Sequence, residues 1–396
     1  MSAPPQLGED LTVPSGKTQT AFVVRGIHDV AFEERPLPAD PGPDDVVVAP
    51  KAITLCGSDT HYIEHGRIGD FVVTCPMVLG HETAAIVTKL GKNVTSLKVG
   101  QRVALEPGRS CRVCSDCKAG YYNRCSEMIF AATPPFDGTL TNFYTLPADL
   151  CYPLPDNMSL EEGALIEPMS VAVHAVHKVA QMPHSANCLI FGAGPVGLLT
   201  AAVAKGLGAR KVIVVDIQES RLKFAIEQGL AHDYLVSPAP KDGESKMDYS
   251  RRAAQEICTR FGFTERGPGG IDLVVDCSGA EVCIQTGIFA LRHGGTLINV
   301  GMGNPEINLP VHTILVKELT IKGSFRYGPG SYQLALDLVA RGAVNLKALI
   351  SHRYEFKDAK LAFEANKAGK GQDGKPLTKA VILGPLDEDA QLVEKK

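Results

Sequence analysis

Residues 188–216 read CLIFGAGPVGLLTAAVAKGLGARKVIVVD, and this stretch decides the fold of one large part of the chain. An apolar run leads into glycines spaced G-x-G-x-x-G, an apolar helical run follows, and a second β-branched run ends in an acid. This order of strand, glycine-rich turn, helix, strand and acid is typical of a dinucleotide-binding βαβ unit. We therefore predict strands over 188–191 and 211–215, joined by a helix that begins at residue 195.

Each residue of the glycine-rich turn has a predicted role. Gly192 permits the turn, Gly194 lets the backbone approach a pyrophosphate, and Gly197 lets the helix pack closely on the strand. Pro195 stands where a missing N–H costs little. Val196 belongs to the first helical turn, whose N–H groups and positive dipole attract phosphate. The turn predicts a bound dinucleotide.

The acid at the end of the second strand predicts which dinucleotide binds. Asp216 lies about 20 residues beyond the glycines, where a carboxylate accepts hydrogen bonds from the adenosine ribose. A 2′-phosphate would meet this carboxylate as a like charge, so the sequence favours NAD over NADP. Arg221 either covers the adenine or is a solvated charge on the helix surface.

The remaining pattern predicts two domains in a chain of 396 residues. Between residues 188 and 300 apolar strands alternate with helices, which predicts a parallel sheet covered on both faces. Residues 20–156 form short β-branched runs broken by Gly and Pro, so a strand-rich domain is expected there. After residue 322 the strand rhythm ends, and we expect the tail to return to the first domain.

Composition and charge exclude several classes of protein. A formal net charge of -4 offers no basic field for nucleic acid. Residues 1–20 lack the apolar run of a signal peptide, so a cytosolic location is expected. Residues 188–204 are apolar but short for a membrane span and rich in glycine, which indicates a buried strand and helix instead. Eleven cysteines in such a chain favour thiolate ligands or buried thiols over disulfides.

Four of these cysteines have the spacing of a metal site. Cys111, Cys114, Cys117 and Cys125 form C-x₂-C-x₂-C-x₇-C, which lets four thiolates converge on one zinc ion. Four sulfur ligands leave no position for a substrate, so this zinc would be structural and would stabilise the lobe at about residues 108–127.

A second set of candidate ligands is dispersed. Cys56 stands in CGSD, His81 and Glu82 follow Gly80, and Glu167 precedes a proline. One sulfur, one nitrogen and one or two oxygen ligands would suit a catalytic zinc that keeps a position open. Spacing alone does not identify this set, because each residue taken singly is more often a buried thiol, a core histidine or a surface acid.

The motifs and their order resemble those of zinc-containing medium-chain alcohol and polyol dehydrogenases, over about residues 23–384. Within that family the chain is similar to the fungal xylitol dehydrogenases. The segments that carry the resemblance are CGSD at 56–59, HGRIGDF at 65–71, PMVLGHE at 76–82, FAATPP at 130–135 and GSFRYG at 323–328.

The resemblance implies an α/β fold with a GroES-like, β-rich catalytic domain and an inserted Rossmann domain with a doubly wound parallel sheet. The catalytic domain would cover 1–176 and 322–396, and the Rossmann domain 177–321. Cys56, His81 and Glu82 would surround the catalytic zinc. Glu167 stands where simple alcohol dehydrogenases have a third ligand cysteine, and it would bind the metal either directly or through water. Polyol dehydrogenases share that replacement.

The family also implies a reaction. A polyol would lose a hydride from a secondary alcohol to NAD and become a ketose, xylitol giving D-xylulose; sorbitol and L-arabinitol are the alternative substrates. Ser58 and His61 match a proton relay, and the positions matching the pocket lining are Tyr62, Phe130, Glu167, Arg326 and Tyr327. An isolated Arg326 is otherwise read as a surface ion pair. A scaffold that binds NAD without catalysis is the alternative, and a zinc-free quinone reductase is disfavoured by both ligand sets.

Other residues are expected to have no role at the site. The six remaining cysteines lack ligand spacing and are interpreted as small hydrophobic residues. His174 and His177 are three apart on a predicted helix without a third ligand, which favours packing. Relatives are commonly tetramers, and we expect the strand near residues 296–300 to extend a sheet between subunits.

Overall fold

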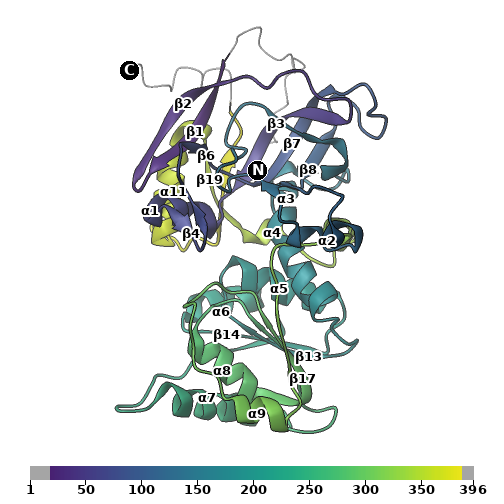
Figure 1. The fold of residues 1–396 in the computed structure, drawn as a ribbon. Coiled ribbons are helices and arrows are strands. Elements are labelled where there is room, and N and C mark those ends of the chain that lie inside the picture. The colour runs from purple at the N-terminus through teal and green to yellow at the C-terminus, as the bar shows by residue number, and fades with distance from the viewer. Residues whose placement is uncertain (1–17, 386–396) are drawn as a thin grey trace. The chain divides into compact units, whose positions relative to one another are not determined.

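The computed structural model describes residues 18–385. The described residues fall into two compact units (Figure 1): the first comprises residues 18–114, 125–167 and 349–385, and the second comprises residues 115–124 and 168–348. The predicted limits at 176/177 and 321/322 stay a prediction. Residues 1–17 and 386–396 lie outside the described residues. The predicted catalytic domain includes both ranges, and the first holds most of the segment considered for a signal peptide.

The first unit is built on a seven-stranded sheet in which the C-terminal segment joins the N-terminal strands. The order is β12-β8-β7-β3-β20-β19, and β11 also pairs with β3. β20 runs antiparallel to β3, so the tail returns to this fold as expected. The strands are β3 (Asp45–Thr54), β7 (Glu82–Leu90), β8 (Arg102–Leu105), β11 (Tyr144–Pro147), β12 (Cys151–Pro153), β19 (Ile350–Tyr354) and β20 (Lys379–Leu383).

Smaller elements surround this sheet. A three-stranded sheet has the order β2-β1-β6, and two-stranded sheets join β4 to β5 and β9 to β10. These strands are β1 (Thr18–Gly26), β2 (Asp29–Pro36), β4 (Arg67–Ile68), β5 (Phe71–Val72), β6 (Met77–Val78), β9 (Gly108–Arg109) and β10 (Ile129–Phe130). The helices are α1 (Gly57–His65), α3 (Leu160–Ala164), α4 (Ile166–Val173, which crosses the division) and α11 (Ala359–Ala368).

Two of these helices have clear local signals. α1 ends at Gly66, which adopts the left-handed conformation with φ 67° and donates its N–H to the Tyr62 carbonyl. α3 begins with a capping box in which Ser159 and Glu162 satisfy each other's backbone N–H groups. The cap at Gly66 fixes the end of α1, the helix that begins directly after Cys56. The capping box fixes the start of α3, the helix that precedes Glu167.

The second unit is a six-stranded parallel sheet, which confirms the predicted α/β class. The strand order is β15-β14-β13-β16-β17-β18. The direction in which successive strands are added reverses between β13 and β16, and such sheets bind ligands in the crevice at this reversal. The strands are β13 (Asn187–Phe191), β14 (Lys211–Asp216), β15 (Asp233–Val236), β16 (Ile271–Asp276), β17 (Leu291–Asn299) and β18 (Thr320–Gly323). The helices are α2 (Ser115–Lys118), α5 (Pro195–Gly206), α6 (Glu219–Glu227), α7 (Lys246–Phe261), α8 (Glu281–Ala290), α9 (Val311–Val316) and α10 (Ser331–Ala340).

The apolar run at 188–204 forms most of β13 and α5, both largely buried, as predicted. Among residues 18–385, no helix has the length and apolar character needed to cross a membrane. The predicted extension of a sheet between subunits by the strand near residues 296–300 would need a free edge at that strand, and this prediction is wrong. β17 is an inner strand, because β18 pairs in parallel with its last four residues, Thr296–Asn299, and takes the edge position.

Candidate functional site

Strand pairing brings three of the dispersed candidates together. Cys56 stands between β3 and α1, and His81 and Glu82 stand at the start of β7. β3 and β7 pair so that Thr54 faces Glu82, which places the two segments side by side. One ligand atom from each of Cys56, His81 and Glu82 lies within 4.8 Å of the others. His81 and Glu82 are buried, while Cys56 is half-buried.

Asp59 supports His81 from the first turn of α1. Its Oδ1 lies 3.4 Å from His81 Nδ1, and the carboxylate is fully buried. Burial lowers the pKa of His81, but Asp59 and Cys56 raise it, and the net pKa lies well above the usual value. The sequence alone does not assign Asp59 a role, although the CGSD motif contains it and helical spacing places it one turn beyond Cys56.

Lys379 is a second residue that the sequence did not reveal. Its Nζ lies 2.7 Å from Glu82 Oε1 and 2.9 Å from the Leu55 carbonyl, and the side chain is buried. The Thr54 hydroxyl donates to the other oxygen of Glu82. Burial lowers the pKa of Lys379, whereas Glu82, Cys56 and Glu167 raise it above its usual value. No spacing signal links residues 82 and 379.

The donor set fits a zinc ion. Three carboxylates, from Asp59, Glu82 and Glu167, are buried in this region together with the ammonium of Lys379. A deprotonated Cys56 would add a further negative charge, so a divalent cation would offset the excess. Thiolate, imidazole and carboxylate are the ligand types of catalytic zinc. Glu167 lies outside the three-atom group, although it influences the pKa of Lys379.

The other predicted residues of the first unit lie near this group. The His81 and Phe130 rings have centroids 5.9 Å apart, and Phe130 is buried. Ser58, His61 and Tyr62 lie on α1. Ser58 is half-buried and His61 is exposed, while Tyr62 is buried at 3% exposure. Ser58 and His61 are three residues apart and therefore share a helix face.

The spacing of the four cysteines correctly predicts that their sulfur atoms converge. The Sγ atoms of Cys111, Cys114, Cys117 and Cys125 all lie within 4.8 Å of one another. The N–H of Cys114 donates to Cys111 Sγ, and the N–H of Cys111 donates to Cys125 Sγ, both at 3.3 Å. N–H groups of Val113 and Cys114 lower the pKa of Cys111 to about 6. Such stabilised thiolates fit a structural zinc.

The glycine-rich turn of the second unit has the expected backbone. Gly192 has φ +94°, and a Cβ at Gly197 would lie 1.8 Å from the Gly192 carbonyl oxygen, so both positions require glycine. A Cβ at Gly194 would meet no protein atom within 4 Å, which leaves space for a ligand. Pro195 begins α5, with Val196 in its first turn.

The acid after the second strand faces this turn. Asp216 Oδ2 accepts a hydrogen bond of 2.6 Å from the Ala193 N–H, and Oδ1 accepts one of 2.8 Å from the Gln218 N–H. Asp216 therefore lies at the glycine-rich turn, and its bond to an adenosine ribose stays a prediction. Arg221 is half-buried on α6, and its position leaves both of its interpretations open.

Arg326 and Tyr327 follow β18 in the second unit. Arg326 has φ +54°, and its guanidinium lies 4.9 Å from the centre of the Phe325 ring. Tyr327 is buried at 2% exposure and packs edge-on against Tyr332, with ring centres 5.2 Å apart. Arg326 is half-buried, whereas an arginine in a surface ion pair is usually exposed.

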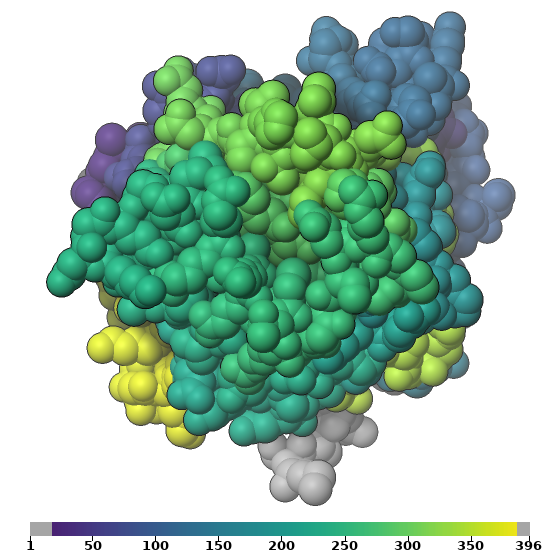
Figure 2. Space-filling view, turned by 90° about the horizontal axis from the view of Figure 1, so that it is seen from below, coloured from purple at the N-terminus to yellow at the C-terminus, as the bar shows by residue number. Residues whose placement is uncertain are grey.

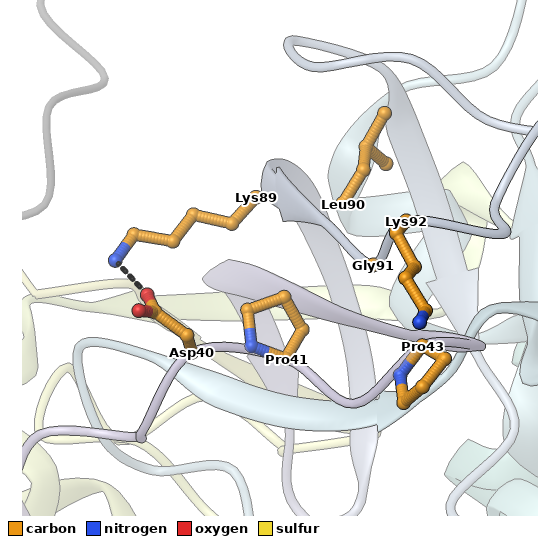
Figure 3. A pocket seen from close by; sticks show the side chains of 7 residues that line it. All are labelled: Asp40, Pro41, Pro43, Lys89, Leu90, Gly91 and Lys92. Atoms are coloured by element: carbon orange, nitrogen blue, oxygen red, sulfur yellow. Dashed lines mark hydrogen bonds and ion pairs between the residues drawn. The ribbon is translucent and has the colours of Figure 1, made fainter.

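A surface pocket of about 480 Å³ lies elsewhere in the first unit (Figure 3). Its lining comes from the loop before β3 and the end of β7. Lys89 Nζ lies 3.0 Å from Asp40 Oδ1 across one side of it. None of the predicted site residues lines this pocket, so the candidate site does not include it.

Comparison with known proteins identifies the family. Residues 42–156 match the alcohol dehydrogenase GroES-like domain, and residues 195–341 match the zinc-binding dehydrogenase model. The chain is 53% identical to the probable D-xylulose reductase A of Aspergillus clavatus, over 93% of this chain and 97% of the relative. The corresponding protein of Neosartorya fischeri is 53% identical, over 89% of this chain and 94% of the relative.

A solved structure shows the same architecture. L-idonate 5-dehydrogenase from Escherichia coli superposes with a TM-score of 0.78 at 27% identity, covering 92% of this chain and 98% of that one. The match extends over both units, and the family models include Cys56, His81, Glu82 and the glycine-rich turn from Pro195 onward. The chain belongs to the zinc-binding alcohol dehydrogenase family, in the branch of the fungal D-xylulose reductases.

Proposed function

We propose that this enzyme interconverts xylitol and D-xylulose, with NAD as the hydride carrier. Two findings support the proposal: Cys56, His81 and Glu82 converge in a buried, negatively charged site, and relatives named D-xylulose reductase A are 53% identical over most of the chain. Oxidation of xylitol removes a hydride from a secondary carbon and a proton from its hydroxyl, which leaves the ketone.

The residues around Cys56 would hold the catalytic zinc. Cys56, His81 and Glu82 would supply the ligand atoms, and Glu167 would hold a water or complete the set. Asp59 orients the His81 ring and favours a proton on the nitrogen that faces it. Bound zinc would supply Lewis acidity, which lowers the pKa of a substrate hydroxyl.

Side chains on α1 would release the proton. Ser58, half-buried, accepts it on the site side, and His61, exposed one turn further along, passes it to solvent. Imidazole suits this task because one ring nitrogen can accept a proton while the other donates one. Tyr62 and Phe130, both buried, would shape the apolar wall of the substrate pocket.

The second unit would bind the cofactor and part of the polyol. The turn from Gly192 to Gly197 is suited to the pyrophosphate, and Asp216 to the adenosine ribose. Bound NAD would accept the hydride. Arg326 offers several N–H donors in a fixed plane to substrate hydroxyls.

A kinetic comparison of substrates tests the function. With xylitol, sorbitol, L-arabinitol, galactitol and ethanol, each with NAD and NADP, we expect the highest kcat/KM for xylitol with NAD. Metal analysis should find two zinc ions per chain. A preference for sorbitol or L-arabinitol would refute the substrate assignment, and absence of NADH formation with every polyol would favour a non-catalytic scaffold.

We propose further that the enzyme is a cytosolic homotetramer. All eleven cysteines are free, which suits a reducing compartment. The second unit exposes apolar side chains on α9 and on the edge strand β18, namely Val311, Leu315, Val316 and Ile321. Figure 2 shows part of the surface of this unit in shades of green. A second copy related by two-fold symmetry would pair with β18 and cover these side chains.

Leu315→Arg should therefore dissociate the assembly into smaller species. Leu315 is 71% exposed in the single chain, and a guanidinium there would have to be desolvated in the interface. Light scattering after size-exclusion chromatography measures the mass. Ile27→Arg, at a residue 58% exposed in the first unit, is the control and should leave the mass unchanged. An unchanged mass for Leu315→Arg would exclude this interface.

A further inference from the structure

The segment Phe325–Gly328 holds a strained residue. Arg326 has φ +54°, a conformation that residues with a side chain rarely adopt. Such strain persists only where the surroundings enforce it. The structure therefore should contain contacts on both sides of Arg326 that hold its backbone.

One anchor lies after Arg326 and the other before it. Tyr327 is buried against Tyr332 of α10. The Phe325 ring is 52% exposed, so packing of the ring does not fix this residue. Its carbonyl oxygen, however, accepts a hydrogen bond of 3.0 Å from Asn123 Nδ2. The amide of Asn123 is thus the anchor on the N-terminal side.

Asn123 belongs to the four-cysteine lobe. It lies in the short 3₁₀ helix η1 (Tyr122–Arg124), between Cys117 and Cys125, and is buried at 9% exposure. The backbone bonds Tyr121 N–H to Asp116 carbonyl and Arg124 N–H to Tyr121 carbonyl hold this turn. The metal-binding lobe therefore sets the position of the Asn123 side chain.

At Gly328 the segment passes near Asn123 a second time. A Cβ built there would lie 3.3 Å from His174 Cε1 and 3.7 Å from Asn123 Oδ1, so the backbone passes close to both side chains. The segment is therefore bounded by Asn123 at Phe325 and again at Gly328, with Arg326 between these contacts.

We infer that Asn123 is a positioning residue through which the four-cysteine lobe holds Arg326 in its polyol-binding conformation. The lobe would then contribute to substrate recognition in addition to stability. The inference rests on the proposed function of Arg326. It predicts that loss of the Asn123 amide weakens polyol binding without affecting the chemical step or NAD.

Asn123→Ala and Asn123→Asp should each raise KM for xylitol about fivefold, since the lost hydrogen bond is worth about 1 kcal/mol. The aspartate keeps the shape of the side chain but removes the donor. We expect kcat and KM for NAD to change less than twofold, with two zinc ions per chain retained. Asn187→Ala is the matched control, because its amide also donates to a backbone carbonyl in the same unit, that of Gly270 at 2.9 Å.

A double-variant cycle separates positioning from a general structural effect. Once Arg326→Ala has raised KM, adding Asn123→Ala should change it no further, because the two residues act through one interaction. Additive effects, an unchanged KM in both Asn123 variants, or the same rise in Asn187→Ala would overturn the inference.

Hydrogen exchange provides a measurement independent of catalysis. Backbone amides of residues 324–330 should exchange faster in Asn123→Asp than in the wild type or in Asn187→Ala. If the wild type oxidises no polyol, the proposed function fails while exchange still tests the anchor. If exchange is unchanged, Asn123 does not hold the segment and the inference fails.

Discussion

His81→Ala is expected to lower kcat/KM for xylitol by more than 100-fold. Residues that only orient zinc ligands cost about 10–100-fold when removed, and His81 would supply a ligand atom itself. Zinc content should fall from two ions per chain toward one, because the four-cysteine lobe is unaffected. NAD should still bind, since the glycine-rich turn lies in the other unit.

The control for this prediction is His352→Ala. His352 also contacts a carboxylate, with its Nε2 3.2 Å from Asp373 Oδ1, and it lies in the same unit outside the ligand group. We expect it to keep both zinc ions and most of the activity. Turnover by His81→Ala near the wild-type rate, or by wild-type enzyme after complete zinc removal, would refute the metal mechanism.

Lys379→Met should destabilise the zinc-free enzyme by about 3–5 kcal/mol, the cost of leaving a buried charge without its partner. The partner is Glu82, which is 1% exposed and cannot gain water in compensation. The loss should be smaller in the zinc-loaded enzyme, because a cation beside Glu82 offsets part of its charge. Urea unfolding followed by circular dichroism measures both states.

Two further variants test the cause of that loss. Adding Glu82→Gln to Lys379→Met should recover much of the stability, since no buried charge then remains unpaired. Lys317→Met removes another buried lysine, but its partner Glu265 has a side chain that is 63% exposed and can hydrate. It should therefore cost less. Equal losses for both lysines, or no recovery with Glu82→Gln, would show that the charge pair is not the source.

Local signals predicted most of the fold. The strands at 188–191 and 211–215 and the helix beginning at Pro195 are present because glycine spacing, apolar runs and helix entry agree over about 30 residues. The edge position was misjudged because β18 is only four residues long and fully exposed, so it lacks the apolar pattern of the inner strands. Short edge strands leave a weak signal of this kind.

The site was predictable only in part. The four cysteines lie within 15 residues, so spacing alone brought their sulfur atoms together. Cys56, His81 and Glu82 required the family resemblance, because the pairing of β3 with β7 joins them. The sequence did not reveal three residues whose partners are distant in the chain. Asp59 lies 22 positions from His81, Asn123 lies 202 from Phe325, and Lys379 lies 297 from Glu82. Contacts over such separations depend on the tertiary fold rather than on any local pattern.

The place of Lys379 on β20 also bears on synthesis of the enzyme. A nascent chain emerging from the ribosome exposes Cys56, His81 and Glu82 early, whereas the lysine that neutralises Glu82 emerges almost 300 residues later. Until then the sheet lacks its strand between β3 and β19. The candidate zinc site is therefore complete only after Lys379 has been synthesised, and a chain terminated before this residue would carry Cys56, His81 and Glu82 without the lysine that neutralises Glu82.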